Sequence, residues 1–179
     1  MRGRLLAIVV LAVIGAAILL GMPRTGAALL SDRPVWHDLP LTNARTGETF
    51  RLVDFAGKTV YVEPMATWCI NCRTQLGVVR EARAQLDPDR VVFVALSVET
   101  SLSNAQLARF AEANGFDWHF AVASPELLQA LTTTYGHTVV NPPTTPHFTI
   151  GPDGATSELS TGFHSAESLV QSLSAIGGG

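Results

Sequence analysis

The sequence predicts one α/β domain, with helices on both faces of a mixed central sheet, behind an apolar N-terminal segment. Two β-rich runs, residues 59–63 and 91–98, alternate with stretches whose apolar residues recur at helical spacing. The expected order is β-α-β-α, then a β-hairpin and a last helix, which is typical of α/β folds. The 179 residues provide for one domain and an extra segment, but not comfortably for two domains.

Turn residues and periodicity place the individual elements. A small N-terminal β-hairpin is expected over residues 36–52, with its turn at residues 43–47. The glycines and the proline of residues 151–154 predict a second hairpin near the end of the chain. The remaining expected elements are strands at 59–63, 91–98, 148–150 and 156–160, and helices at 70–86, at 103–113, from Ser124 onward and at 165–176.

The first 22 residues form a distinct segment. Arg2 and Arg4 precede an uncharged run over residues 5–22, whose length is close to the minimum needed to span a bilayer. A positive start before an apolar run is an export signal, and the positive-inside rule places the rest of the chain outside the cytoplasm. We therefore expect residues 1–22 to be an uncleaved single-pass membrane anchor, 23–34 a tether and 35–176 the folded domain. Secretion after signal cleavage is the alternative.

Charge and composition narrow the possible functions. The net charge is −3, only 15% of the residues are charged, and no basic stretch follows the N-terminus. Phosphate binding needs a clustered positive surface, so the sequence argues against a nucleic-acid partner. We expect no cofactor, no metal site and a monomer.

The only two cysteines, Cys69 and Cys72, stand between the strand at 59–63 and the helix at 70–86. A disulfide that closes so short a loop adds little stability, which favours a redox role over a structural one. Unsatisfied N–H groups and the positive dipole end of the helix stabilise a thiolate at its N-terminus. Cys72, one turn further on, is placed to attack a mixed disulfide formed there. Trp68 supplies an apolar platform beside the pair.

The segment 60–72, with its Ala-Thr-Trp-Cys-Ile-Asn-Cys string, resembles the active-site segment of the thioredoxin superfamily. It is most similar to the membrane-anchored TlpA/ResA-like thiol–disulfide oxidoreductases, and the C-terminal domain of the DsbD-type reductant transporter has a similar segment. The resemblance covers residues 35–175. It implies a thioredoxin fold, an exposed Cys69 as the attacking nucleophile and a more buried Cys72 as the resolving thiol.

The resemblance also assigns supporting residues. Glu63, six residues before the first cysteine, would be a buried acid that accepts and returns the proton of the resolving thiol, with burial raising its pKa. Pro146 would be a cis-proline opposite the cysteines, which lets the preceding Thr145 lie beside the sulfurs and pair with an extended substrate. Gln75 stands where ResA-like proteins often carry a glutamate, so proton handling would fall on Glu63 alone or on water.

We therefore expect a thiol–disulfide oxidoreductase that acts outside the cytoplasmic membrane. By resemblance, it would reduce disulfides of exported proteins, such as apocytochrome c or copper-centre assembly proteins. An upstream membrane thiol reductant would restore its dithiol. The motif equally permits the reverse, oxidising direction.

Two rival functions share some of these features. SCO-like copper binding is one, because two thiolates and a histidine suit Cu(I). SCO-like proteins space their cysteines one residue further apart, and His147, the only histidine expected near the sulfurs, is expected to be a surface residue of an edge strand. A peroxiredoxin-like peroxidase is the other, and it would need a Pro-x-x-x-Thr/Ser-x-x-Cys frame, which the sequence lacks.

Overall fold

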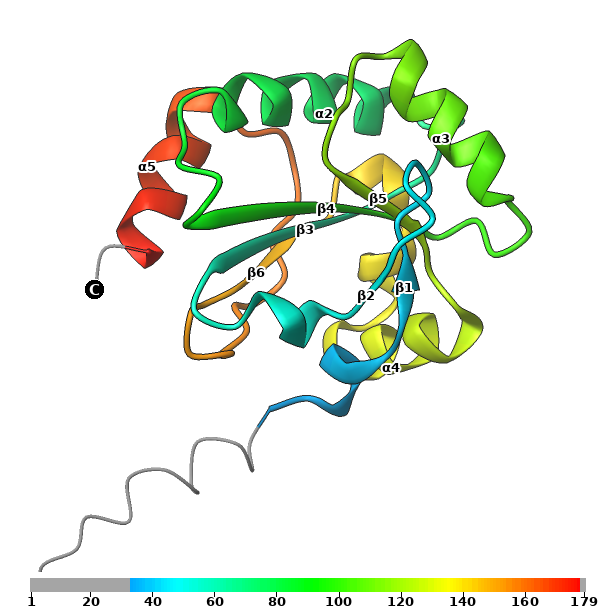
Figure 1. The fold of residues 1–179 in the computed structure, drawn as a ribbon, viewed down its shortest axis with the longest axis horizontal. Coiled ribbons are helices and arrows are strands. Elements are labelled where there is room, and N and C mark those ends of the chain that lie inside the picture. Colours follow the sequence, from blue (N-terminus) through cyan, green and yellow to red (C-terminus); the bar gives the residue numbers. More distant parts are fainter. Residues whose placement is uncertain (1–32, 178–179) are drawn as a thin grey trace, which may run out of the picture. The chain divides into compact units, whose positions relative to one another are not determined.

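A four-stranded mixed sheet forms the centre of the domain in the computed structural model, which describes residues 33–177 (Figure 1). The strand order is β5-β4-β3-β6, in which β6 alone runs antiparallel to its neighbour. The uniformly buried β3 and β4 occupy the middle of the sheet, as their apolar sequences predict. The strands are β3 (Thr59–Met65), β4 (Val91–Ser97), β5 (His119–Val122) and β6 (Phe148–Ile150).

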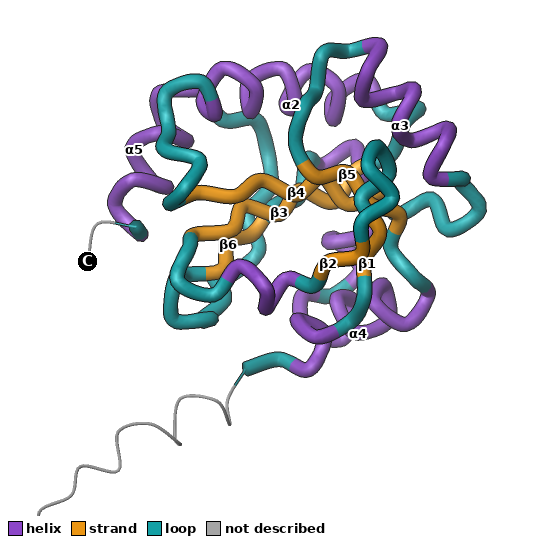
Figure 2. Tube along the Cα trace, viewed as in Figure 1, coloured by secondary structure: helices purple, strands orange, loops and turns teal. Residues whose placement is uncertain are grey.

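Helices cover both faces of this sheet (Figure 2). Alternate side chains of β3 and β4 point to opposite faces. Tyr61 and Phe93 join a cluster with α2, α3 and α5, whereas Val62 and Val94 join a second cluster with α4 and the N-terminal elements. The predicted α/β class is therefore confirmed. The helices are α2 (Ile70–Arg83), α3 (Asn104–Ala113), α4 (Pro125–Tyr135) and α5 (Ala166–Ile176).

The N-terminal hairpin is present but smaller than predicted. Its antiparallel arms, β1 (Leu41–Thr42) and β2 (Thr49–Phe50), have two residues each. Trp36 lies outside the hairpin, in the 3-10 turn η1 (Val35–Asp38), where its buried ring packs edge-on against Phe148. A second 3-10 turn, η2 (Leu52–Phe55), connects the hairpin to β3.

Three expectations about the elements need correction. The helix expected over 70–86 ends at Arg83, and two hydrogen-bonded turns, from Ala82 to Gln85 and from Arg83 to Leu86, follow it. The strand expected over 156–160 is reduced to two isolated bridges, Ile150 with Thr156 and His147 with Ser160. The edge strand β5 was not expected, because its four residues carry too weak a pattern until they pair with β4.

Helix starts distinguish α2 from the other helices. A serine caps each of α3, α4 and α5, because the side-chain oxygen of Ser103, Ser124 or Ser165 accepts a hydrogen bond from an N–H of the first turn. In α2 the capping atom is the sulfur of Cys69. The free N–H groups at the start of this helix therefore face a redox-capable atom.

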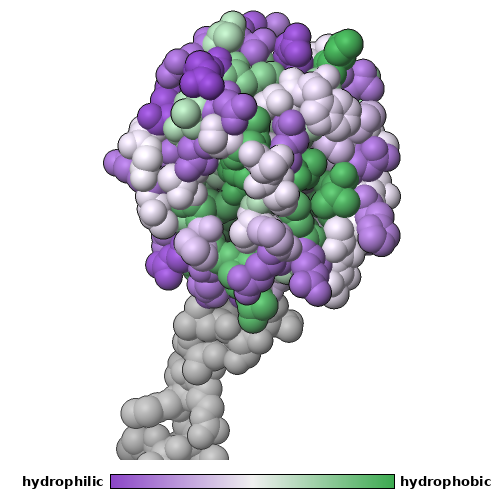
Figure 3. All heavy atoms as spheres, turned by 90° about the vertical axis from the view of Figure 1, so that its right-hand side faces the viewer, coloured by the Kyte–Doolittle hydropathy of each residue, from purple (hydrophilic) through white to green (hydrophobic). Residues whose placement is uncertain are grey.

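The face seen in Figure 3 has hydrophilic side chains around its edge and hydrophobic ones between them near its middle. None of the helices in the described part of the chain is long and apolar enough to cross a bilayer. The spanning segment predicted at 5–22, and most of the tether at 23–34, lie outside the described residues.

Candidate functional site

The two cysteines form a disulfide at the point where β3 ends and α2 begins. Their Cα atoms are 5.3 Å apart. The N–H of Cys72 donates to the sulfur of Cys69 over 3.1 Å, so that sulfur sits at the positive end of the helix dipole. After reduction, the same N–H would stabilise a thiolate at Cys69.

The two sulfurs have different surroundings. Cys72 is completely buried, and its sulfur lies 3.3 Å from the carbonyl oxygen of Pro142, to which a reduced thiol could donate a hydrogen bond. Cys69 is 3% exposed, so it is the more accessible of the two but far less open than predicted, because its sulfur is turned inward to cap the helix. The surroundings favour a thiolate at Cys69 and a protonated thiol at Cys72.

A loop between α4 and β6 closes over the disulfide. It contains two 3-10 turns, η3 (His137–Val140) and η4 (Pro142–Thr144). The side-chain amide of Asn71, between the cysteines, donates to the carbonyl of Pro143 over 2.9 Å. The position of this loop therefore depends on Asn71, a residue for which no role was predicted.

The cis peptide bond expected at Pro146 is not present, since no peptide bond between residues 33 and 177 is cis. Instead, Thr145 takes a left-handed conformation, with φ 47° and ψ 57°, and this turns the chain toward β6. The Thr145 N–H donates to Pro142, and its carbonyl lies 3.1 Å from Nδ1 of His147. Both backbone groups expected to pair with an extended substrate are thus used within the chain. Thr145 and Pro146 are themselves buried.

Glu63 is buried in β3 on the same face as Tyr61 and Met65, which belong to the cluster that contains both cysteines. No group among the described residues donates a hydrogen bond to either of its carboxyl oxygens. Burial raises the pKa of Glu63 from 4.5 to about 8, and the nearby Tyr61 hydroxyl opposes the shift in part. A carboxyl group in this state can exchange protons near neutral pH.

Two polar contacts around the site were not predicted from the sequence. The carboxylate of Glu99, just after β4, accepts from the N–H of Thr67 over 2.5 Å and so holds the loop before the cysteines. Gln75 is buried one turn after Cys72, and its side-chain oxygen accepts from the N–H of His164 over 3.0 Å. Hydrophobic periodicity does not reveal such polar contacts between distant segments.

His147 lies in the interior and not, as expected, on the surface. Its ring stacks on Tyr61 with the centroids 5.4 Å apart and meets the ring of His164 edge-on at 4.4 Å. Burial is the largest cause that lowers its pKa from 6.5 to about 4, so the imidazole is neutral at physiological pH. The isolated bridge with Ser160 covers this edge of β6 and explains the difference.

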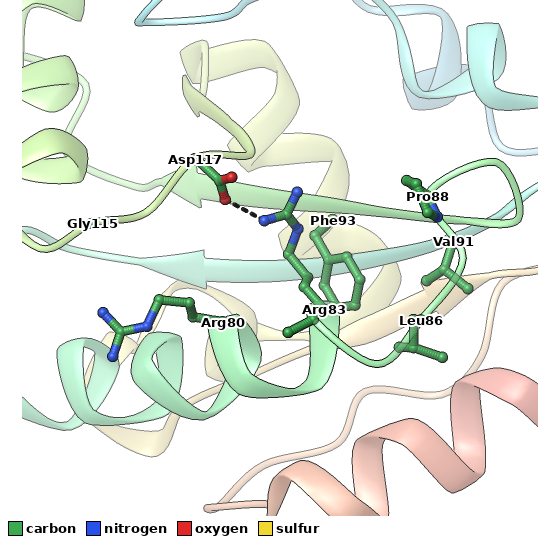
Figure 4. A pocket seen from close by; sticks show the side chains of 9 residues that line it. Arg80, Arg83, Leu86, Pro88, Val91, Phe93, Gly115 and Asp117 are labelled. Carbon is green, nitrogen blue, oxygen red and sulfur yellow. Dashed lines mark hydrogen bonds and ion pairs between the residues drawn. The ribbon is translucent and has the colours of Figure 1, made fainter.

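A pocket of about 390 Å³ lies at the far end of α2, away from the disulfide (Figure 4). Arg83 points across it to an ion pair with Asp117, and its guanidinium lies over the ring of Trp118. Because Arg83 is 14 residues from Cys69, about 20 Å along the helix, this pocket is separate from the redox pair. The ion pair between Arg83 and Asp117 links α2 to the start of β5.

A family model described as the AhpC/TSA family matches residues 36–155, well over half of the chain. The chain belongs to the AhpC/TSA family. Membership and the Cys-x-x-Cys pair together support protein-disulfide oxidoreductase activity. The structure also places this AhpC/TSA-family protein among the thioredoxin-like folds.

Three solved structures are similar to this AhpC/TSA-family protein. A thioredoxin-family thiol:disulfide interchange protein from Chlorobium tepidum TLS is 19% identical, with a TM-score of 0.58, over 77% of this chain and 92% of that one. A secreted disulfide oxidoreductase from Mycobacterium tuberculosis is 15% identical, with a TM-score of 0.60, over 76% and 95%. BsSco, of the Sco family of cytochrome c oxidase assembly proteins, is 15% identical, with a TM-score of 0.62, over 78% and 91%. At these identities the likeness concerns the fold.

Alkylation of the reduced protein should distinguish the two thiols. Each cysteine is tested alone, Cys69 in the Cys72→Ser variant and Cys72 in the Cys69→Ser variant. We expect the rate of modification by iodoacetamide to reach its plateau at a lower pH for Cys69 than for Cys72. The physical reason is the N–H hydrogen bond and helix dipole at Cys69, against burial at Cys72. Mass spectrometry of the alkylated fraction over time measures both rates. Identical pH profiles would contradict the assignment.

Glu63→Gln should change how stability depends on pH. The folded protein holds the Glu63 proton up to a pKa of about 8, whereas the unfolded chain releases it near 4.5. Wild-type stability is therefore lost as the pH rises through this window, by roughly 4 kcal/mol. The variant carries no charge there, so its advantage over wild type should grow from pH 4.5 to pH 9 in urea unfolding. Exposed Glu48→Gln is the control, and a constant difference would exclude a raised pKa.

Proposed function

We propose that this protein reduces disulfides of exported proteins outside the cytoplasmic membrane. The single observation that carries the proposal is the asymmetry of the sulfur pair. The sulfur of Cys69 accepts an N–H at a helix start, whereas the sulfur of Cys72 is buried beside the Pro142 carbonyl. Cys69 is thus suited to attack the substrate, and Cys72 to remain protonated until it resolves the mixed disulfide.

The reaction requires two exchanges. In the dithiol form, the Cys69 thiolate attacks one sulfur of the substrate disulfide and forms a mixed disulfide, while the other substrate sulfur leaves as a thiolate and takes a proton. Cys72 then gives its proton to Glu63 and attacks the Cys69 sulfur. This step forms the protein disulfide and releases the second substrate thiolate, which is also protonated. Two electrons pass from the protein to the substrate, and an upstream membrane thiol reductant restores the dithiol.

Apolar side chains around the pair provide for contact with a protein partner. Trp68, Ile70 and Phe163 are between 58% and 74% exposed. Phe163 is held next to the site because its neighbours are fixed: the Gly162 N–H donates to Thr144, and the His164 N–H donates to Gln75. Since the backbone of Thr145 is already hydrogen-bonded, we infer that these side chains contribute most to docking.

The proposed setting follows from the N-terminal segment. Residues 5–22 would anchor the protein in the cytoplasmic membrane, with the domain on the periplasmic side, or would be removed to release it. Exported proteins with exchangeable disulfides, such as apocytochrome c or copper-centre assembly proteins, are the proposed substrates. The protein would act as a monomer.

Copper binding of the Sco kind has less support. Between residues 33 and 177, no three side chains of histidine, cysteine, aspartate or glutamate are grouped so that they could hold a metal ion. His147 is buried, with Nδ1 facing the Thr145 carbonyl and its ring against Tyr61. The disulfide-exchange proposal is therefore preferred.

A trapping experiment tests the proposed function. In the full-length Cys72→Ser protein expressed in its own host, Cys69 can form but not resolve a mixed disulfide. We expect covalent adducts with exported proteins on non-reducing gels, and their loss after reduction. Cys69→Ser is the control and should trap few or none. Stronger trapping by Cys69→Ser would reverse the roles of the two thiols, and no adduct with either variant would refute the proposal.

Phe163→Ser tests the docking surface. We expect the variant to lose about tenfold in kcat/KM toward a protein substrate that contains a disulfide, because one aromatic contact buried on docking is lost. Its rate with a small disulfide should not change, because that substrate does not reach Phe163. Val35→Ser removes an apolar side chain from η1 that is even more exposed than Phe163, 82% against 58%, and serves as the control. Equal losses with both substrates would indicate damage to the site and not loss of a docking contact.

A further inference from the structure

Several buried polar groups lie together beneath the redox pair. The Tyr61 hydroxyl, both Glu63 carboxyl oxygens and the Gln75 side-chain nitrogen have no hydrogen-bond partner among the described residues. All three residues are 2% exposed or less. Buried polar groups without partners are costly, so a cluster of them calls for an explanation.

These groups converge from two elements that are packed face to face. Tyr61 and Glu63 are two residues apart on β3, so both side chains leave the same face of the sheet, toward α2. Gln75 descends from α2, one turn after Cys72. Because its side-chain oxygen accepts from His164, its NH₂ group is free to point to other partners. Glu63 raises the pKa of the Tyr61 hydroxyl and Gln75 lowers it, so both side chains lie near Tyr61.

A cavity lies beside Tyr61, the one member of this cluster that lines it. It has a volume of about 190 Å³ and is lined by Tyr61, His147 and His164, together with Ser160 and Ser172. His164 is half-buried, whereas Tyr61 and His147 are buried, so the cavity leads from the interior toward solvent. Its hydroxyl and imidazole groups can donate and accept protons.

We propose that Tyr61 and Gln75 are positioning residues for Glu63, and that the proton which Glu63 takes from Cys72 leaves through the Tyr61 hydroxyl into the cavity beside His147 and His164. The inference rests on the proposed disulfide exchange. Cys72 transfers its proton to the Glu63 carboxylate as its sulfur attacks. The carboxyl group then passes its proton to the Tyr61 oxygen while the Tyr61 hydroxyl releases its own through the cavity to solvent, which returns Glu63 to the carboxylate and keeps Tyr61 neutral.

The charges around Glu63 agree with this route. The titratable groups on the elements packed against this face are Cys72 on α2, Tyr61 on β3, His147 before β6 and His164 before α5. Tyr61 stays protonated, because burial and the nearby Glu63 charge raise its pKa well above 10. His147 stays neutral, since burial lowers its pKa. The Tyr61 hydroxyl is thus the donor beside Glu63 that can stabilise a carboxylate, and Gln75 acts on Glu63 through Tyr61.

Reaction of the reduced protein with 5,5′-dithiobis(2-nitrobenzoate) separates the two exchanges. Attack by Cys69 releases the first thionitrobenzoate, and resolution by Cys72 releases the second. We expect the second phase to become faster as the pH rises through the pKa of Glu63, about 8. In Tyr61→Phe, it should slow about tenfold below pH 8, with its inflection moved to higher pH, because a donor to the carboxylate is lost. The first phase should not change.

Two further comparisons keep the test independent of general damage. Tyr135→Phe removes the phenol on α4, which belongs to the opposite face of the sheet, and should leave both phases as in wild type. If Tyr61 acts through Glu63, adding Tyr61→Phe to Glu63→Gln should slow the second phase no further. Gln75→Leu should show the same non-additivity.

The outcomes separate the two proposals. The proton route would be overturned if the second phase of Tyr61→Phe had the wild-type rate at every pH, or if the rate losses of Tyr61→Phe and Glu63→Gln were additive in the double variant. The disulfide exchange would still stand. Absence of the first phase in wild-type protein would instead refute the proposed exchange itself.

Discussion

The N–H of Cys72 donates to the sulfur of Cys69, and this contact determines how the site is built. It places one sulfur at the start of α2, where a negative charge is stabilised, and keeps the second sulfur one turn inside the helix. The remaining features of the site hold this junction in place. β3 supplies a rigid base beneath it, Glu99 fixes the loop before it, and Asn71 ties the η4 loop across it.

The same junction explains why a carboxyl group is buried nearby. Glu63 costs stability in the apolar layer between β3 and α2, because no group among the described residues donates to its oxygens. A raised pKa is the consequence, and it gives the domain a proton acceptor that works near neutral pH. A buried carboxyl group at this position thus lowers the stability of the fold but serves the proposed reaction. The nearby Tyr61 hydroxyl moderates the conflict, because it partly opposes the rise in the pKa of Glu63.

In the segment before β6, local hydrogen bonds occupy the Thr145 backbone that was expected to pair with a substrate. Pro142 accepts from Thr145 and faces Cys72, while the Thr145 carbonyl is occupied by His147. With its backbone committed in this way, the segment shields the inner sulfur and does not offer a strand edge. Contact with a partner then falls to exposed side chains, among which Phe163 comes from a loop distant in sequence from the cysteines.

Features that depend only on neighbours along the chain follow from the amino-acid sequence alone. The apolar runs of β3 and β4, a helix that starts at Ser124, and a cysteine pair between a strand and a helix could all be predicted directly, because periodicity and capping are local properties. The sequence also indicated that Glu63 would be buried. The other features arise only in the folded domain, from contacts between distant segments. Pairing with β4 creates β5, Pro142 and Asn71 close the site, and packing on Tyr61 buries His147, since each needs a partner 20 or more residues away.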